Sequence, residues 1–293
     1  MIHFFHLGDI MQTPEIVLLG LSSSGKTHFA GQLYGRLRRT KGNLLLRQDG
    51  GTPPDLSPLD NVLNSLASGH AAEHTQVQTW AEIALPIVDN EGRCFDLRWP
   101  DYGGEQLTNA FLQRAISEAW RERLRRASGW IVLIRLKTET TYPEVLTRLR
   151  EGPHEDSVNT ARVSKWDANA RWVEMLQIFL HVAGHGVVDQ LKVPKIAVML
   201  SCYDELGVAS KTPAEVLAER LPLVSSFIKS NWSSNKASVW GLSALGGALD
   251  KDSCNEHFID EGPETLGWVV DPSGSRSSDL TLPLAWILKE MDR

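Results

Sequence analysis

The sequence has few cysteines, no excess of basic residues and no long apolar run. Its three cysteines, Cys94, Cys202 and Cys254, are far apart and include no Cys-x-x-Cys pair, so neither a disulfide framework nor a zinc ribbon is indicated. The stretch 1–11 lacks a basic start followed by an apolar run and is too short to span a bilayer. The net charge of −6 argues against a general nucleic-acid binder. We expect a cytoplasmic protein with no membrane partner and no nucleic-acid partner.

Strand-like and helix-like segments alternate through most of the chain. This order predicts a three-layer α/β fold, in which a mostly parallel sheet with one antiparallel hairpin strand has helices on both faces. We expect strands at 15–19, 129–136, 193–201 and 237–244, and a hairpin within 75–101. We expect helices after Lys26 and at 59–69, 106–126, 167–186, 212–232 and 282–293. The prediction is one domain over residues 1–293, with insertions near 40–74, 150–165 and 246–280.

The short stretch GLSSSGKTHF has the pattern of a phosphate-binding loop. The pattern consists of two glycines five apart followed by Lys and Thr, and Gly20, Gly25, Lys26 and Thr27 supply it. An apolar run precedes the stretch and an amphipathic segment follows it. Strand, glycine-rich turn and helix in this order aim backbone N–H groups at an anion. The residues that we predict to contact a nucleotide here are Gly20, Ser22, Ser23, Ser24, Gly25, Lys26, Thr27 and His28.

A second glycine-rich stretch, FDLRWPDYGGEQL, follows the expected hairpin. A phosphate site needs a divalent metal, and the metal needs a carboxylate at the end of a neighbouring strand. Asp101 ends the expected strand, and Gly103 and Gly104 allow the backbone to come close to a terminal phosphate. This stretch therefore predicts a metal ligand beside the phosphate-binding loop.

With these two motifs the chain resembles the P-loop GTPases of the Ras-like, translation-factor-related class. Their second signature is Asp-x-x-Gly, which here runs from Asp101 to Gly104 and is followed by Glu105. The resemblance implies that Asp101 and Thr27 hold Mg²⁺, that the Gly104 N–H contacts the γ-phosphate, and that Lys26 neutralises the phosphates. The residue after this glycine positions the attacking water in many relatives. Because Glu105 would place a negative charge beside the γ-phosphate, we expect slow unaided hydrolysis.

The resemblance also implies guanine recognition at two further strand ends. In VMLSCYDEL, Asp204 matches the aspartate that accepts hydrogen bonds from the guanine N–H groups. Ser201 and Cys202 replace the asparagine and the lysine of the family's Asn-Lys-x-Asp signature, in which the lysine packs on the base. In LSAL, Ser243 and Ala244 match the Ser-Ala-Lys signature, and the Ala244 N–H would meet the guanine carbonyl. The expected ligands are therefore GTP or GDP with Mg²⁺.

The first switch of such proteins contributes one threonine to the metal. We assign this role to Thr75, which starts the strand leading into the hairpin, and Thr79 is the alternative. The separation between Gly25 and Asp101 is longer than in a minimal Ras-like domain. Together with PDYGGE and the closing LPLAWIL, it resembles the bacterial double-GTPase families, which occur in multi-gene conflict and signalling systems.

Three functions remain open from the sequence. The first is a magnesium-dependent GTPase that acts as a molecular switch and signals to a protein partner through loops held by the γ-phosphate. The second is an ATP-using enzyme on the same loop, such as a small kinase, because two positions of the base signature are replaced. The third is a nucleotide-bound structural subunit with little turnover, which Glu105 favours.

Overall fold

The computed structural model describes residues 14–39, 44–47, 55–72, 81–101, 105–142, 166–186, 188–208, 210–250 and 254–289. Within them the chain forms a nine-stranded sheet in the order β2-β3-β4-β1-β5-β6-β7-β8-β9. The strands are β1 (Glu15–Gly20), β2 (Leu44–Leu46), β3 (Ala81–Asp89), β4 (Cys94–Asp101), β5 (Ala127–Ile134), β6 (Lys195–Ser201), β7 (Ala237–Ser243), β8 (Trp268–Val270) and β9 (Arg276–Ser277). The five central strands, β4, β1, β5, β6 and β7, run parallel, and the outer strands pair antiparallel.

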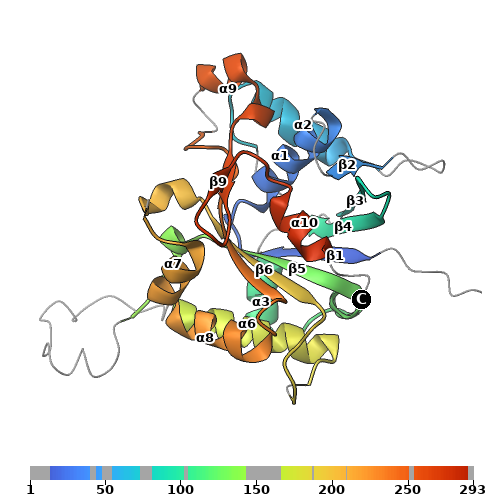
Figure 1. Ribbon diagram of the computed structural model, residues 1–293, viewed down its shortest axis with the longest axis vertical. Coiled ribbons are helices and arrows are strands. Elements are labelled where there is room, and N and C mark those ends of the chain that lie inside the picture. Colours follow the sequence, from blue (N-terminus) through green and yellow to red (C-terminus); the bar gives the residue numbers. More distant parts are fainter. Residues whose placement is uncertain are drawn as a thin grey trace, which may run out of the picture.

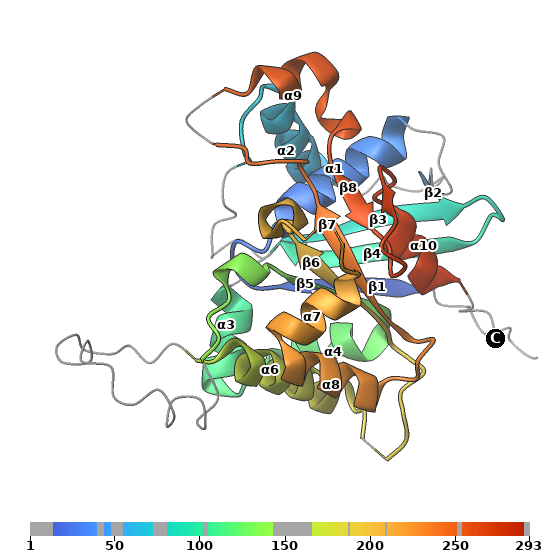
Figure 2. The same cartoon turned by 60° about the vertical axis from the view of Figure 1, so that its left-hand side comes forward.

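Helices cover both faces of this sheet (Figures 1 and 2). On one face lie α1 (Lys26–Arg39), α2 (Ser57–Ala67) and α10 (Leu282–Leu288), with α9 (Glu256–Glu261) beside α2. On the other lie α3 (Glu105–Gln113), α4 (Glu118–Arg126), α6 (Ala168–Ala183), α7 (Pro213–Arg220) and α8 (Pro222–Asn231). None of these described helices has the length and apolar character needed to cross a bilayer. The predicted three-layer α/β class is confirmed.

Strand β1 shows how the sequence places a strand at the centre of three layers. All six of its residues are buried. Successive side chains of a strand point to opposite faces, so Ile16 and Leu18 pack in the core with α1, whereas Val17 and Leu19 pack in the core with α6. A strand that is buried on both faces has a continuous apolar sequence, which is why EIVLL predicts a central strand.

Two helices that the sequence predicts as continuous are broken, so the predictions of single helices over 106–126 and 212–232 are wrong. In the first, Arg114 adopts a left-handed φ of 55° after α3, and Ser117 caps α4 by accepting a hydrogen bond from the Trp120 N–H. In the second, Pro222 begins α8 because it has no N–H to continue α7. The apolar spacing continues across both breaks, so periodicity alone does not reveal them.

The sheet extends past the last strand expected from the sequence. After β7 the chain forms α9, a 3₁₀ turn η4 (Pro263–Thr265), and the short strands β8 and β9, with Gly241 of β7 paired to Val270. At the opposite edge, β2 pairs with β3. These elements fall in the insertions expected near 40–74 and 246–280, while 150–165 lies outside the described residues. The division of the chain into one domain with three insertions stays a prediction.

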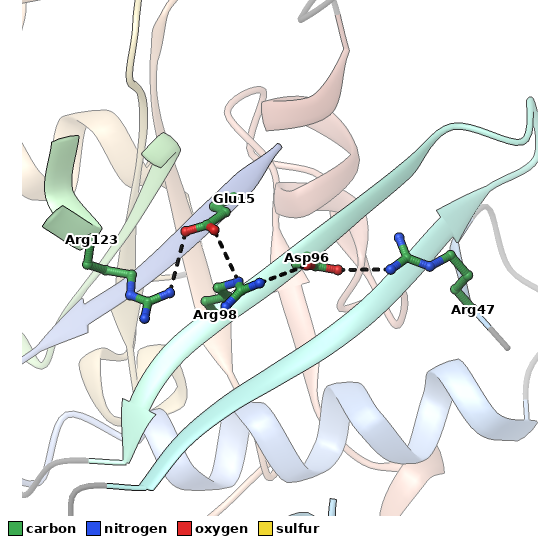
Figure 3. A network of polar contacts seen from close by, with 5 residues as sticks. All are labelled: Glu15, Arg47, Asp96, Arg98 and Arg123. Carbon is green, nitrogen blue, oxygen red and sulfur yellow. Dashed lines mark hydrogen bonds and ion pairs between the residues drawn. The ribbon is translucent and has the colours of Figure 1, made fainter. Parts of the chain in front are cut away.

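A charged network joins the amino end of β1 to its neighbours (Figure 3). Glu15, at 7% exposed, pairs with Arg98 of β4 and Arg123 of α4. Asp96 pairs with Arg98 and with Arg47, which follows β2. The buried Glu15 and the partly buried Asp96 therefore each have two guanidinium partners, which offsets the cost of removing the carboxylates from water. This network lies at the end of β1 opposite to the phosphate-binding pattern.

Candidate functional site

The predicted phosphate-binding pattern forms the turn between β1 and α1. Gly20 ends the strand and Lys26 begins the helix. Little space is left for a side chain at residue 20, because a Cβ there would lie 2.5 Å from the Ser24 Oγ and 3.2 Å from the Leu133 carbonyl oxygen. Gly25 has a φ of 81°, which strongly favours glycine. The strand, turn and helix expected from the sequence are confirmed, and the turn leads into the unpaired N–H groups of a helix start.

The side chains of this turn divide into exposed and buried ones. Ser22 and Ser23 are exposed, whereas Ser24 is buried. The Lys26 Nζ donates to the carbonyl oxygens of Gly20 at 2.8 Å and Leu21 at 2.7 Å, so the ammonium lies against the turn. Thr27 is partly buried in the first helical turn beside it. A cation and a row of N–H donors around one turn form an anion site.

Loops after β1, β5, β6 and β7 meet at the carboxyl edge of the parallel strands, where open α/β sheets bind ligands. A cavity of about 180 Å³ opens between these loops. Of the residues singled out from the sequence, those that line it are Gly25, His28, Ser201, Cys202, Asp204 and Ala244. The structure therefore places the phosphate-binding turn and both proposed base-reading segments around one cavity.

Asp204 belongs to a short 3₁₀ turn, η3 (Tyr203–Leu206), that follows β6. The turn begins at Cys202, which has a left-handed φ of 50°. Tyr203 packs on Gly241 of β7, where a Cβ would lie 2.9 Å from the ring. Burial raises the pKa of the Cys202 thiol to about 11, so a neutral thiol lines the cavity at neutral pH. The lysine of the base signature is thus replaced by a small uncharged group.

Ser243 and Ala244 have different places after β7. Ser243 is buried at the strand end, and its Oγ accepts a hydrogen bond from the Gly246 N–H at 3.1 Å. Ala244 follows it and lines the cavity. The Ala244 carbonyl is crossed closely by Gly267, where a Cβ would lie 2.4 Å from it. Ser243 therefore stabilises the loop through its hydrogen bond to Gly246, and Ala244 lines the cavity.

Two further residues that line the cavity, Arg135 and Glu205, were not identified as site residues from the sequence motifs. Arg135 follows β5, and its Nε and Nη2 donate to the Glu205 carboxylate at 3.1 and 2.5 Å. Its Nη1 donates to the Ser23 carbonyl oxygen at 3.4 Å. The hydrogen bonds between the two side chains raise the pKa of Arg135 and lower the pKa of Glu205. The sequence expectation of a strand over 129–136 included Arg135, whereas β5 ends at Ile134, and the signal was a charged residue at the end of an apolar run.

His28 and helix α2 enclose the cavity on its other side. The His28 Nε2 accepts a hydrogen bond from the Ala72 N–H at 3.2 Å. Leu66 of α2 and Ala72 belong to a small apolar cluster against which Leu245 and Leu249 pack, and these two leucines line the cavity. The segment that was expected as an insertion near 40–74 therefore supports the cavity wall.

Several of the predicted site residues cannot be located in the site. Thr75, the alternative Thr79, and Gly104 lie outside the described residues, and for Asp101 and Glu105 the structure describes the backbone alone. Asp101 is the last residue of β4, and Glu105 is the first of α3. Because β4 pairs in parallel with β1, Asp101 ends a strand next to the one that Gly20 ends. Within the described ranges, no three histidine, cysteine or carboxylate side chains cluster as a metal site would require.

Comparisons with solved structures return low similarity. A bacterial selenocysteine-specific elongation factor is 13% identical over 81% of this chain and 26% of its own length, with a TM-score of 0.37. A small GTPase from Trypanosoma brucei with a bound nucleotide analogue is 13% identical over 81% of this chain and 90% of its own, with a TM-score of 0.36. A signal recognition particle receptor complex from Chaetomium thermophilum is 15% identical over 82% of this chain and 94% of its own, with a TM-score of 0.39. The chain thus spans about a quarter of the elongation factor. No curated protein matches the sequence.

A protein-family comparison is more informative. The family described as Double-GTPase 1 matches residues 17–287. This span begins within β1, includes the phosphate-binding turn, η3 and the loop after β7, and ends within α10. All the loops that surround the cavity therefore fall inside the match. The chain therefore belongs to the double-GTPase 1 family of P-loop GTPases, which it was expected to resemble from the separation of Gly25 and Asp101 and from the stretches PDYGGE and LPLAWIL.

Proposed function

We propose that this protein is a magnesium-dependent GTP-binding switch that hydrolyses GTP slowly and signals to a protein partner. Membership of a GTPase family supports binding of guanine nucleotides in general. The observation that carries the finer proposal is the shared cavity, because Gly25 and His28 of the phosphate side line it together with Asp204 and Ala244 of the base side. Phosphate and base sites serve one ligand only if they adjoin in this way.

The phosphate end of the ligand would lie on the turn between β1 and α1. Lys26 neutralises the β- and γ-phosphates, and the backbone N–H groups of 22–27 donate hydrogen bonds to their oxygens. The ammonium of Lys26 already lies against this turn through its bonds to Gly20 and Leu21. The turn therefore offers both a point charge and fixed dipoles to the phosphates.

Hydroxyl and carboxylate oxygens are the ligands that Mg²⁺ prefers, and Thr27, Asp101 and Thr75 supply this chemistry. Thr27 begins α1, and Asp101 ends the strand beside the one that leads into α1. Mg²⁺ bound there would neutralise part of the charge on the β- and γ-phosphates. These three residues fit the metal by type, and Thr27 and Asp101 also fit by their place in the fold.

Guanine would lie in the cavity with its hydrogen-bonding edge toward η3. The Asp204 carboxylate accepts hydrogen bonds from the ring N–H and the exocyclic amino group, and the Ala244 N–H donates to the carbonyl. Adenine presents an acceptor and a donor in the opposite places, so it would leave the Asp204 carboxylate and the Ala244 N–H unpaired. The base preference of the site therefore depends mainly on Asp204.

The switch would operate through the γ-phosphate. In this proposal the Gly104 N–H contacts that phosphate and Thr75 holds the Mg²⁺ beside it, and both contacts are lost after hydrolysis. Helix α3 begins at Glu105, directly after this contact, so a protein partner that reads the nucleotide state would bind near α3. The negative charge of Glu105 opposes charge on the γ-phosphate, and we expect unaided turnover on the order of 10⁻⁴ to 10⁻² per second.

The test is nucleotide binding by the Lys26→Ala variant, measured by calorimetry with GDP and Mg²⁺. We expect GDP affinity to fall about tenfold to a hundredfold, since Lys26 makes a charge-assisted bond to the β-phosphate. Lys229→Ala, which removes an exposed lysine of α8, is the matched control and should bind as the parent does. Unchanged affinity in Lys26→Ala would contradict the proposal. Equal competition by ATP and GTP against the parent would instead favour an ATP-using enzyme, and tight GTP binding without turnover would favour a structural subunit.

A further inference from the structure

The cavity has no cationic side chain from the segment that carries the base signature. Cys202 stands in the lysine position, and its partly buried thiol stays neutral because desolvation raises its pKa to about 11. A thiol also offers no flat surface to a purine. Arg135, which comes from the end of a different strand, lines the same cavity and lies next to the segment where the lysine is missing.

We propose that Arg135 supplies the surface on which the nucleobase stacks, and that Glu205 is the positioning residue that fixes the guanidinium plane. This inference rests on the proposed function, because it concerns how the same cavity holds the base. It assigns a role in the base site to two residues that belong to none of the sequence motifs.

Three hydrogen bonds fix the orientation of the Arg135 guanidinium. Two go to the Glu205 carboxylate, at 3.1 and 2.5 Å, and form a bidentate pair. The third goes to the Ser23 carbonyl oxygen at 3.4 Å. Glu205 directly follows Asp204, and Ser23 lies in the phosphate-binding turn, so the guanidinium bridges the two ends of the ligand site. A bidentate pair holds a planar group in one plane, which a single contact does not do.

None of these hydrogen bonds uses a face of the guanidinium plane. The hydrogen bonds of Arg135 all use the N–H groups on the edge of the guanidinium, and its side chain remains 28% exposed. Guanidinium faces are weakly hydrated and stack on aromatic rings, and such stacking tolerates different bases. Leu245 and Leu249 provide an apolar wall in the same cavity. A purine there would have a cationic plane and an apolar wall as its neighbours.

A purely structural role for Arg135 makes a different prediction. If the ion pair only joins η3 to the phosphate-binding turn, its loss disturbs the turn and weakens phosphate binding as much as nucleotide binding. If Arg135 stacks on the base, its loss weakens binding only of ligands that carry a base. Inorganic pyrophosphate and GDP share the phosphates and differ in the nucleoside, so the two ligands separate these roles.

The experiment measures the dissociation constants of GDP and of pyrophosphate, each with Mg²⁺, for the parent, Arg135→Ala, Arg135→Lys and Glu205→Gln. The control is Arg121→Ala, which removes an arginine that pairs with Glu118 on the surface of α4. For Arg135→Ala we expect GDP affinity to fall about tenfold to a hundredfold and pyrophosphate affinity to change less than about twofold. Arg135→Lys and Glu205→Gln should show smaller losses for GDP alone.

Two results would overturn the inference while leaving the proposed function intact: GDP affinity that does not change in Arg135→Ala, or equal losses for GDP and pyrophosphate. Thermal unfolding of each variant shows whether the fold is retained, and a loss confined to GDP in a folded variant supports stacking. If the parent binds neither ligand, the proposed function is wrong and the inference falls with it.

Discussion

Asp204 is presented to the cavity by neighbours that differ from those of the family signature. Cys202 makes the left-handed turn before it, and Tyr203 anchors the turn on Gly241. Glu205, directly after it, is held by Arg135. The backbone of Asp204 therefore lies between two anchored residues, and its side chain is exposed. In the proposed complex a wrong base would leave this carboxylate unpaired, which gives specificity.

We expect Asp204→Asn to change base preference from guanine toward xanthine. An amide donates a hydrogen bond where the carboxylate accepted two, and xanthine carries a carbonyl in place of the exocyclic amino group of guanine. The loss for GDP should be about tenfold to a hundredfold, the usual range for a hydrogen bond to a charged group. Displacement of a fluorescent guanine nucleotide by GDP and by xanthosine diphosphate measures it, with the surface change Glu219→Gln as control. An unaltered order of preference would remove Asp204 from the base site.

Helix α1 approaches α2 closely because two of its buried positions are glycines. A Cβ on Gly31 would lie 2.4 Å from the Val62 Cγ1, and one on Gly35 would lie 3.0 Å from the Leu63 Cδ2. Through this contact the helix that begins at Lys26 supports α2, and α2 in turn packs against the cavity wall at Leu249. The closeness of two helices thus connects the phosphate turn to the cavity wall.

Gly31→Ala should destabilise the fold although alanine favours helix. The propensity gain is about 1 kcal/mol, whereas overpacking against a β-branched side chain costs about 1–3 kcal/mol. Adding Val62→Ala makes room for the new methyl group, so the double variant should recover most of the stability. Urea unfolding followed by tryptophan fluorescence gives the free energies. Gly186→Ala, at a glycine with open space around it, is the control. A stabilised Gly31→Ala variant would show that the helices separate at little cost.

At the scale of the whole molecule, the segment after β7 is fastened to α1 near the start of the chain. Arg36 is 6% exposed and donates to the Gln32 Oε1 at 2.7 Å and to the Leu266 carbonyl oxygen at 2.5 Å. Burial lowers the pKa of Arg36 to about 10, so it remains charged at neutral pH. Arg39 reaches Glu264 in the same segment, but its side chain is 69% exposed.

The two arginines should therefore differ in their effect on stability. Arg36→Met keeps an apolar stem but leaves the buried Gln32 Oε1 and the partly buried Leu266 carbonyl without this donor, at a cost of about 1–3 kcal/mol. Arg39→Ala removes an exposed ion pair, which contributes about 0–1 kcal/mol. Urea unfolding of both variants beside the parent measures the difference. Equal losses would mean that the segment is held by its packing rather than by the buried guanidinium.

Much of the phosphate side was predictable because its information is local. The strand, turn and helix around Gly20 and Lys26 follow one another in the sequence. Gly20 is favoured by its close approach to Ser24 and Leu133, and Gly25 is favoured by its positive φ. Buried central strands were predictable from their continuous apolar runs. The breaks at Ser117 and Pro222 were missed because the apolar spacing continues across them. Strands β8 and β9 were missed because strands of two or three residues carry no periodic signal and form by pairing with an existing edge.

The sequence by itself determined the central strands, the turn between β1 and α1, and the candidate base-reading positions Asp204 and Ala244. Each of these depends on residues within one strand and the loop that follows it. Only the tertiary structure decided what completes the cavity. Arg135 donates a hydrogen bond to Ser23, which is 112 residues away in the sequence. Leu66 of α2 belongs to the apolar cluster against which Leu249 packs, although the two residues are far apart in the sequence. The physical reason is that parallel strands bring their carboxyl ends to one edge, so side chains become neighbours through the sheet without any pattern along the sequence.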